Sequence, residues 1–237
     1  MANTSWIEVK QEVLSRNTEM ANGFRSQRAA GGTLAVDVLG SPGAGKTTFL
    51  LALAEHLRKT KQAQIGVIEA DLESDVDALK IKQSGIPSVE LNTKGLCHVE
   101  MGMMQQAFDA FRSTDFDYLF LENIGNLVCP AEFDTGCHLR IMLLSIPEGY
   151  DKVYKYPPMF SIVDALVVTK LDYLPLNPDF DMTALRDGAR FLNPNLKIFE
   201  VSARTREGID VVATWLSEKR QQILADRNEL KGYGNVH

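Results

Sequence analysis

The residues with the clearest chemical meaning form a glycine-rich segment at positions 40–48, which reads GSPGAGKTT. This segment matches the phosphate-loop pattern G-x-x-x-x-G-K-[ST] at every position. Its glycines allow backbone N–H groups to converge on a phosphate. Lys46 would reach the β- and γ-phosphates, and the Thr47 hydroxyl would bind Mg²⁺. We therefore expect a nucleoside triphosphate to be held by Gly43, Ala44, Gly45, Lys46, Thr47 and Thr48.

Three acidic residues and one glycine would complete the phosphate chemistry. The apolar run 65–70 ends at Asp71, with Asp75 close behind, and the apolar run 118–121 ends at Glu122. Glu122 resembles the acid that holds Mg²⁺ in a Walker B element, and Gly125 would offer its N–H to the γ-phosphate. Asp71 or Asp75 would orient or deprotonate the attacking water, although Asp75 could equally cap a helix that begins there.

A base-binding element is predicted at residues 169–172, which read TKLD. It resembles the guanine-reading N-K-x-D sequence with Thr169 in place of asparagine. Asp172 would accept hydrogen bonds from guanine N1–H and the 2-amino group, donors that adenine lacks, and the Lys170 stem would cover the ring. A second base contact is predicted at Ser202 and Ala203, which resemble the S-A-K loop. The substitution at Thr169 predicts somewhat relaxed base selectivity.

Thiols and imidazoles suggest a separate metal site. Cys97 and His98 are adjacent, and Cys129 follows Gly125 by four residues. These groups suit a soft or borderline divalent ion such as Ni²⁺ or Zn²⁺. Because three ligands are too few for a closed structural site, an open site or one shared by two subunits fits better. Cys137 and His138 form a second pair, which we place at the start of a strand and do not favour as ligands.

The elements that must position these residues alternate between strand and helix along the chain. Apolar strands are expected near 34–39, 65–70, 89–91, 118–122, 141–146, 165–169 and 196–201, and helices near 5–28, 49–57, 75–84, 99–112, 181–191 and 208–224. Such alternation predicts an α/β P-loop NTPase, with a mostly parallel twisted sheet and helices on both faces. The predicted organisation is an N-terminal helical extension over 1–32, a GTPase domain over 33–224 and a tail over 225–237. The segment 147–158 is predicted as a polar loop.

Bulk composition excludes several classes of protein. The chain has 237 residues and a formal net charge of −6, with 45% hydrophobic and 24% charged residues. No basic run points to nucleic acid, and no apolar stretch approaches the roughly 20 residues of a membrane helix. The amino terminus lacks the pattern of a signal peptide. With three cysteines in no disulfide framework, these features predict a cytoplasmic protein.

Beyond these motifs, several segments resemble the HypB family of GTPases, which serve nickel insertion into [NiFe] hydrogenase. The resemblance spans about residues 33–215 and is carried by four segments: 97–98 (CH), 122–131 (ENIGNLVCPA), 144–152 (LSIPEGYDK) and 155–157 (KYP). It implies a SIMIBI-class GTPase that forms a homodimer with GTP and carries metal at the dimer interface. The family's metal ligands map onto Cys97, His98 and Cys129, and Lys155 maps onto a residue that contacts nucleotide across the dimer. Implied partners are a nickel chaperone and a hydrogenase large subunit or another metalloenzyme.

The chain also departs from the family pattern. Its 237 residues contain no amino-terminal cysteine motif or histidine-rich stretch, and the family's C-H-L-D-A-H-M reads CHVEMGM at residues 97–103. Cys137 and His138 stand where Gly-Glu and a basic residue are expected. Two other functions fit the phosphate loop: a small-molecule kinase, which would need no guanine reader, and a nucleotide-gated scaffold that hardly hydrolyses.

Overall fold

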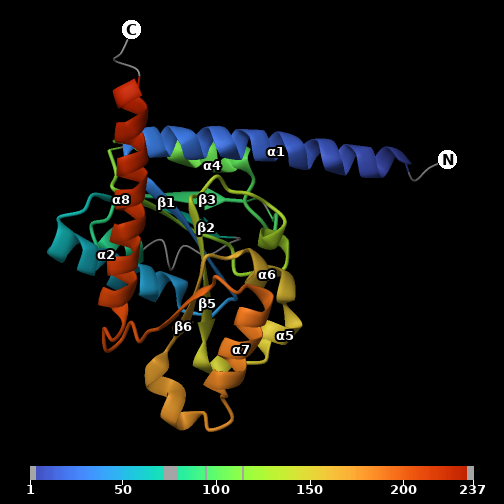
Figure 1. The fold of residues 1–237 in the computed structure, drawn as a ribbon, viewed down its shortest axis with the longest axis vertical. Coiled ribbons are helices and arrows are strands. Elements are labelled where there is room, and N and C mark those ends of the chain that lie inside the picture. Colours follow the sequence, from blue (N-terminus) through green and yellow to red (C-terminus); the bar gives the residue numbers. More distant parts are fainter. Residues whose placement is uncertain (1–3, 72–79, 94, 114, 234–237) are drawn as a thin grey trace.

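A computed structural model describes residues 4–71, 80–93, 95–113 and 115–233 (Figure 1). Its centre is one seven-stranded sheet with the strand order β3-β2-β4-β1-β5-β6-β7, and every described pairing in it is parallel. The strands are β1 Leu34–Gly40, β2 Ile65–Asp71, β3 Ser88–Asn92, β4 Tyr118–Glu122, β5 Leu139–Ser145, β6 Ala165–Thr169 and β7 Lys197–Glu200. The predicted fold class and all seven predicted strands are confirmed.

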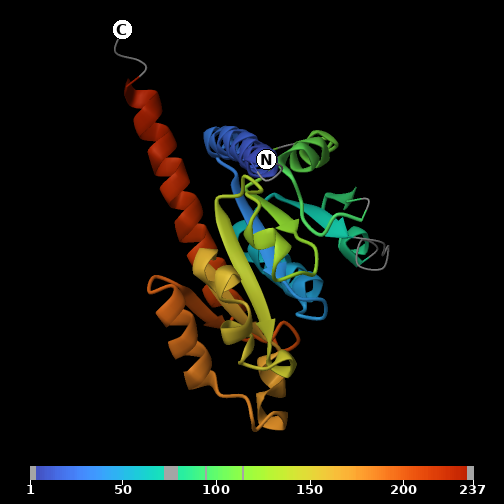
Figure 2. The same ribbon diagram turned by 90° about the vertical axis from the view of Figure 1, so that its right-hand side faces the viewer.

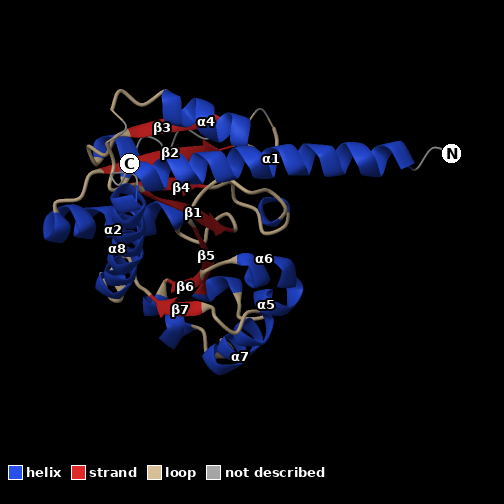
Figure 3. Ribbon diagram, turned by 45° about the horizontal axis from the view of Figure 1, so that its top comes forward, coloured by secondary structure: helices blue, strands red, loops and turns tan. Residues whose placement is uncertain are grey.

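Helices cover both faces of this sheet (Figure 3). The helices are α1 Thr4–Gly31, α2 Lys46–Lys61, α4 Met101–Asp109, α5 Lys152–Lys155, α6 Pro157–Ile162, α7 Met182–Leu192 and α8 Ile209–Tyr233. Strands β1, β4 and β6 are buried at every residue, because a parallel sheet between two helical layers exposes neither face to water. Their near-continuous apolar sequences follow from that burial.

The first and last helices differ from the sequence prediction in length. Helix α1 continues to Gly31, beyond the predicted end near residue 28, and α8 continues to Tyr233, beyond the predicted end near Leu224. Figure 1 shows the amino-terminal half of α1 extending past the rest of the molecule, and Figure 2 looks along this helix from its amino end. Its carboxyl-terminal half is anchored by Phe24 and Arg28, which pack on Phe108 of α4 with the Arg28 guanidinium 3.8 Å from the ring centroid.

The predicted loop at 147–158 is wrong, because it holds short helices. The 3₁₀ turn η2 covers Ile146–Glu148, and α5 and the start of α6 follow. Prolines mark the first turns of η2 and α6, where the missing N–H costs nothing and the fixed φ suits a helix. Sequence reasoning took these prolines as loop residues. Two further 3₁₀ turns, η1 Cys129–Ala131 and η3 Leu171–Leu176, lie in segments where no helix is predicted from the sequence.

Candidate nucleotide and metal site

The phosphate loop joins the carboxyl end of β1 to the amino end of α2. Gly43 and Gly45 have φ values of 82° and 89°, in the left-handed region that suits glycine. The loop borders a cavity of about 480 Å³ at the carboxyl edge of the sheet. That cavity is lined by Pro42, Gly43, Gly45, Lys46, Thr47, Thr48, Glu69, Ala70, Lys80, Glu122, Asn123, Ile124, Gly125 and Lys170. The predicted phosphate-binding residues thus surround one cavity, with Ala44 buried beneath it.

Oxygen ligands suited to Mg²⁺ meet beside Lys46. The Thr47 hydroxyl donates to Glu122 Oε1 across 2.7 Å, and both side chains are buried. Glu69 of β2 is the register neighbour of Glu122 and lines the same cavity. A hydroxyl and one or two carboxylates fit the way Mg²⁺ binds next to phosphates. Sequence reasoning missed Glu69, although an acid inside the apolar run of β2 was an available signal.

Of the two acids predicted to activate water, only Asp71 lies within the described residues. Asp71 is the last residue of β2, so its backbone lies at the edge of the sheet that carries the cavity. Asp75 lies outside the described residues. A catalytic role for either residue stays a prediction.

The loop after β4 packs directly on the phosphate loop. A Cβ added to Gly125 would lie 2.8 Å from Pro42 Cγ, closer than a side chain can approach, so glycine is required there. One residue further, Asn126 forms an antiparallel bridge with Gly40, the first glycine of the phosphate loop. A movement of the phosphate loop would therefore displace residues 125 and 126, which contact it directly.

The predicted base-binding elements are brought together. Ser202 Oγ donates to Asp172 Oδ1 across 2.7 Å and accepts from Thr205 N across 3.2 Å, which fixes the carboxylate. Thr169 Oγ1 donates to Ala44 O across 2.7 Å, and Lys170 Nζ donates to Gly43 O across 2.8 Å. The segment that would bind the base is thus tied to the segment that would bind the phosphates.

The two predicted metal-binding thiols also meet. The pKa of Cys97 lies above its usual value, chiefly because the Cys129 thiol lies beside it. His98 Nδ1 lies 3.9 Å from Cys97 Sγ, while the ring stacks on Phe133 with centroids 3.6 Å apart. Across 4–71, 80–93, 95–113 and 115–233, no three His, Cys, Asp or Glu side chains gather around one metal position. This chain thus brings together two of the three predicted ligands, with His98 beside them.

The second pair, Cys137 and His138, is structural. His138 Nδ1 accepts from Ala35 N across 3.0 Å, and Nε2 lies 3.1 Å from Arg25 O, so both ring nitrogens have backbone partners. Cys137 is buried, and that burial raises the pKa of its thiol well above the usual range. The expectation that this pair starts a strand, here β5, is confirmed, and its contacts leave no ring nitrogen for a metal.

The buried histidine predicts an acid-sensitive stability. Burial lowers the pKa of His138 from 6.5 to about 4, so the unfolded chain takes up the proton at a higher pH than the folded chain. Stability is therefore lost as pH falls from 6.5 towards 4. Protonation of His138 in the unfolded chain should lower the free energy of unfolding by about 2 kcal/mol at pH 5 relative to pH 7.5. Urea unfolding at both pH values tests this. His138→Gln, which can keep both hydrogen bonds, should show a smaller pH difference; an equal difference would contradict the assignment.

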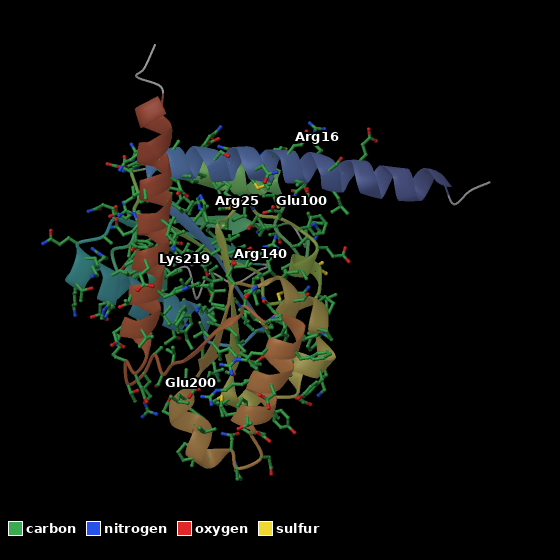
Figure 4. The ribbon with its side chains drawn as sticks, in the orientation of Figure 1. Arg16, Arg25, Glu100, Arg140, Glu200 and Lys219 are labelled. Atoms are coloured by element: carbon green, nitrogen blue, oxygen red, sulfur yellow. The ribbon has the colours of Figure 1, made fainter. Side chains whose placement is uncertain are left out.

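A buried polar network links the loop after β4 to strand β1. Asp37 of β1 accepts hydrogen bonds from Asn123 Nδ2 and Thr135 Oγ1, each at 2.9 Å, and burial raises its pKa. Next to it, Arg25 of α1 donates to both oxygens of Asp134, at 2.6 and 2.9 Å. Figure 4 labels Arg25 on α1 and Arg140 on β5, the second arginine beside Asp134. Helix α1 is thereby linked to the segment that follows Glu122.

Lys155 lies outside this cluster of functional residues. Its exposed ammonium group forms an ion pair with Asp151, the residue that precedes α5. It does not line the cavity beside the phosphate loop. The predicted contact with nucleotide across a dimer stays a prediction.

Together, the parallel sheet, the phosphate loop and the adjoining magnesium ligands define a P-loop nucleotide-binding protein. Residues 34–200 match the family described as CobW/HypB/UreG, nucleotide-binding domain. The chain is 38% identical to the hydrogenase maturation factor HypB of Escherichia coli strain K12, covering 93% of this chain and 75% of that protein. It is 36% identical to the hydrogenase/urease maturation factor HypB of Helicobacter hepaticus, covering 93% and 90%. The chain belongs to the HypB family of hydrogenase maturation factors.

Solved structures agree with this assignment. The crystal structure of HypB from Helicobacter pylori in complex with nickel superposes with a TM-score of 0.81 at 32% identity, covering 87% of this chain and 96% of that one. HypB from Archaeoglobus fulgidus superposes with a TM-score of 0.79 at 29% identity, covering 87% and 99%. None of the described helices is long and apolar enough to cross a membrane.

Proposed function

We propose that this protein is a GTP-hydrolysing metallochaperone that binds nickel and delivers it during maturation of [NiFe] hydrogenase or a related metalloenzyme. The observation that carries the proposal is the direct packing of the loop 123–129 on the phosphate loop, because that loop ends at one of the two paired thiols. Membership of the HypB family supports the same function. The nickel-bound relative supports nickel as the cargo.

Hydrolysis would use the residues around the cavity. Thr47, Glu122 and the nearby Glu69 would hold Mg²⁺, which neutralises charge on the β- and γ-phosphates when bound. Lys46 and the inward N–H groups of residues 43–47 would stabilise negative charge as the terminal phosphoryl group leaves. Asp71 or Asp75 would orient water. We expect slow turnover by the protein alone, because the phosphate loop, the loop after β4 and the base-binding elements contain no evident arginine finger.

Selectivity for guanine would come from Asp172, which Ser202 holds in place. We expect Thr169→Asn to tighten GTP binding by about threefold to tenfold, because an asparagine side chain could keep the contact with Ala44 O and add an amide contact to the base. Competition of GTP and ATP against a fluorescent GDP analogue measures the effect. Unchanged GTP affinity in Thr169→Asn would show that Thr169 does not limit base recognition.

The cargo would be bound by Cys97 and Cys129, with His98 recruited by rotation of its ring. We propose that GTP promotes a homodimer, that the metal lies at its interface and that Lys155 contacts the nucleotide of the other subunit. A nickel chaperone would load this site, and a hydrogenase large subunit would receive the ion. The cytoplasm is the proposed location, because the free thiols proposed to bind the metal persist in a reducing compartment.

Phosphate release from GTP is the direct test of the enzymatic part. Purified protein with Mg²⁺ should release phosphate from GTP under single-turnover conditions and much less from ATP. Transfer of the phosphoryl group to a small molecule instead of water, detected by chromatography of labelled products, would identify a kinase. Nucleotide binding without any hydrolysis would identify a scaffold.

A further inference from the structure

Asn126 touches three functional segments at once. Its backbone pairs with Gly40 at the start of the phosphate loop. Its side-chain Oδ1 accepts from Val128 N across 2.8 Å, and its Nδ2 lies 3.5 Å from Cys97 O. Val128 immediately precedes Cys129, so the amide of one half-buried side chain contacts the backbone beside each thiol.

The position of Asn126 makes it sensitive to bound nucleotide. It follows Gly125, which packs on Pro42 and lines the nucleotide cavity. A γ-phosphate that draws the Gly125 N–H inward would shift the following peptide, because Gly125 is packed against Pro42 and shares its Cα with that peptide. The Asn126 side chain would carry that shift outward, since its two hydrogen bonds end on the chain at residues 97 and 128.

We propose that Asn126 is the positioning residue that transmits the state of the phosphate loop to the Cys97–Cys129 thiol pair. The proposal rests on the proposed function and names the side chain through which nucleotide and metal are coupled. Coupling of this kind requires an element with two arrangements that both sites bias. The bridge between Gly40 and Asn126, together with the two side-chain bonds, is that element.

The chain offers a closely matched control at Asn193. Asn193 Oδ1 also accepts from the backbone two residues ahead, Asn195 N, across 3.2 Å, and its Nδ2 donates to Val163 O across 2.9 Å. Asn193 directly follows α7, and Val163 directly precedes the segment that enters β6. Both residues therefore lie towards the amino ends of the strands. Asn193→Ala therefore removes the same kinds of hydrogen bond without touching either the phosphate loop or the thiols.

The test measures thiol reactivity in metal-free protein with Mg²⁺ and either GDP or a non-hydrolysable GTP analogue. Ellman's reagent reports the rate at which Cys97 and Cys129 react, while Cys137 is buried. In the unmodified protein the two nucleotides should change the rate by about fivefold or more, the size of an ordinary coupling energy. Asn126→Ala should bring that ratio close to one, and Asn193→Ala should leave it unchanged.

A second variant separates transmission from simple support of the loop. Asn126→Asp keeps an oxygen that can accept from Val128 N, but it cannot donate to Cys97 O. In this variant the nucleotide should still change the reactivity of Cys129 but no longer that of Cys97. Mass spectrometry of the labelled protein identifies which thiol has reacted. This variant also covers the case in which Asn126→Ala does not fold. A wild-type ratio in Asn126→Ala, or equal rates with both nucleotides in unmodified protein, would overturn the proposal. If thiol rates respond but metal affinity does not, the proposed function fails while the role of Asn126 stands.

Discussion

Replacing Lys46 with alanine is expected to lower kcat/KM for GTP hydrolysis by at least about a hundredfold, with little loss of folding stability. Its ammonium group lies 3.4 Å from Gly40 O and 3.5 Å from Ser41 O, at the mouth of the cavity. There it would neutralise charge that develops between the β- and γ-phosphates. Lys80 and Lys170 also line the cavity, but Lys170 donates to Gly43 O and neither belongs to the phosphate-loop sequence, so we expect neither to replace Lys46.

Lys59→Ala is the matched control for this measurement. Lys59 lies on the same helix as Lys46, but its side chain is exposed and pairs with Glu55, one turn away. Its removal should cost no more than a few tenths of a kcal/mol in unfolding free energy and leave hydrolysis intact. Hydrolysis by Lys46→Ala at the rate of Lys59→Ala would show that this loop does not carry the reaction.

Replacing Cys129 with alanine is expected to weaken nickel and zinc binding by at least about tenfold. The reason is that Cys129 supplies one of only two thiols that meet in the structure. Loss of second-shell partners alone commonly costs 10- to 100-fold in metal affinity, so loss of a thiolate ligand should cost at least as much. Isothermal titration of nucleotide-free protein with each metal gives the dissociation constants.

Cys137→Ala distinguishes a ligand effect from a general effect of removing a thiol. Cys137 is 5% exposed and packs in the core cluster with Phe24 and Met101, so its truncation should reduce stability by about 1 kcal/mol. Metal affinity should not change. If Cys137→Ala lost metal and Cys129→Ala kept it, the assignment of the two cysteine pairs would have to be reversed.

Local patterns predicted the architecture well because each strand carries its own signal. The apolar runs of β1 and β4 are buried on both faces, and the glycines of the phosphate loop adopt the left-handed conformations that their type allows. The magnesium pair Thr47 and Glu122 was predicted from motif order alone, and the two side chains indeed form a hydrogen bond. Features with a local cause, or with a fixed order of motifs along the chain, were therefore accessible from sequence.

Features that depend on packing between distant segments were not accessible. Glu69 lies opposite Glu122 only because β2 and β4 are neighbours in that register. Asp37 is tolerated in a buried strand only because Asn123 and Thr135 donate to it, and nothing in its own segment indicates those donors. The role of His138 likewise follows from contacts with Ala35 and Arg25, far away in sequence.

The central claim is that the nucleotide controls the metal. It is tested most directly by measuring the dissociation constant of nickel with Mg²⁺-GDP and with a non-hydrolysable GTP analogue, by equilibrium dialysis of the same protein preparation. We expect the two constants to differ by about fivefold or more, and Lys46→Ala to abolish the difference. Equal constants in unmodified protein saturated with each nucleotide would contradict the account.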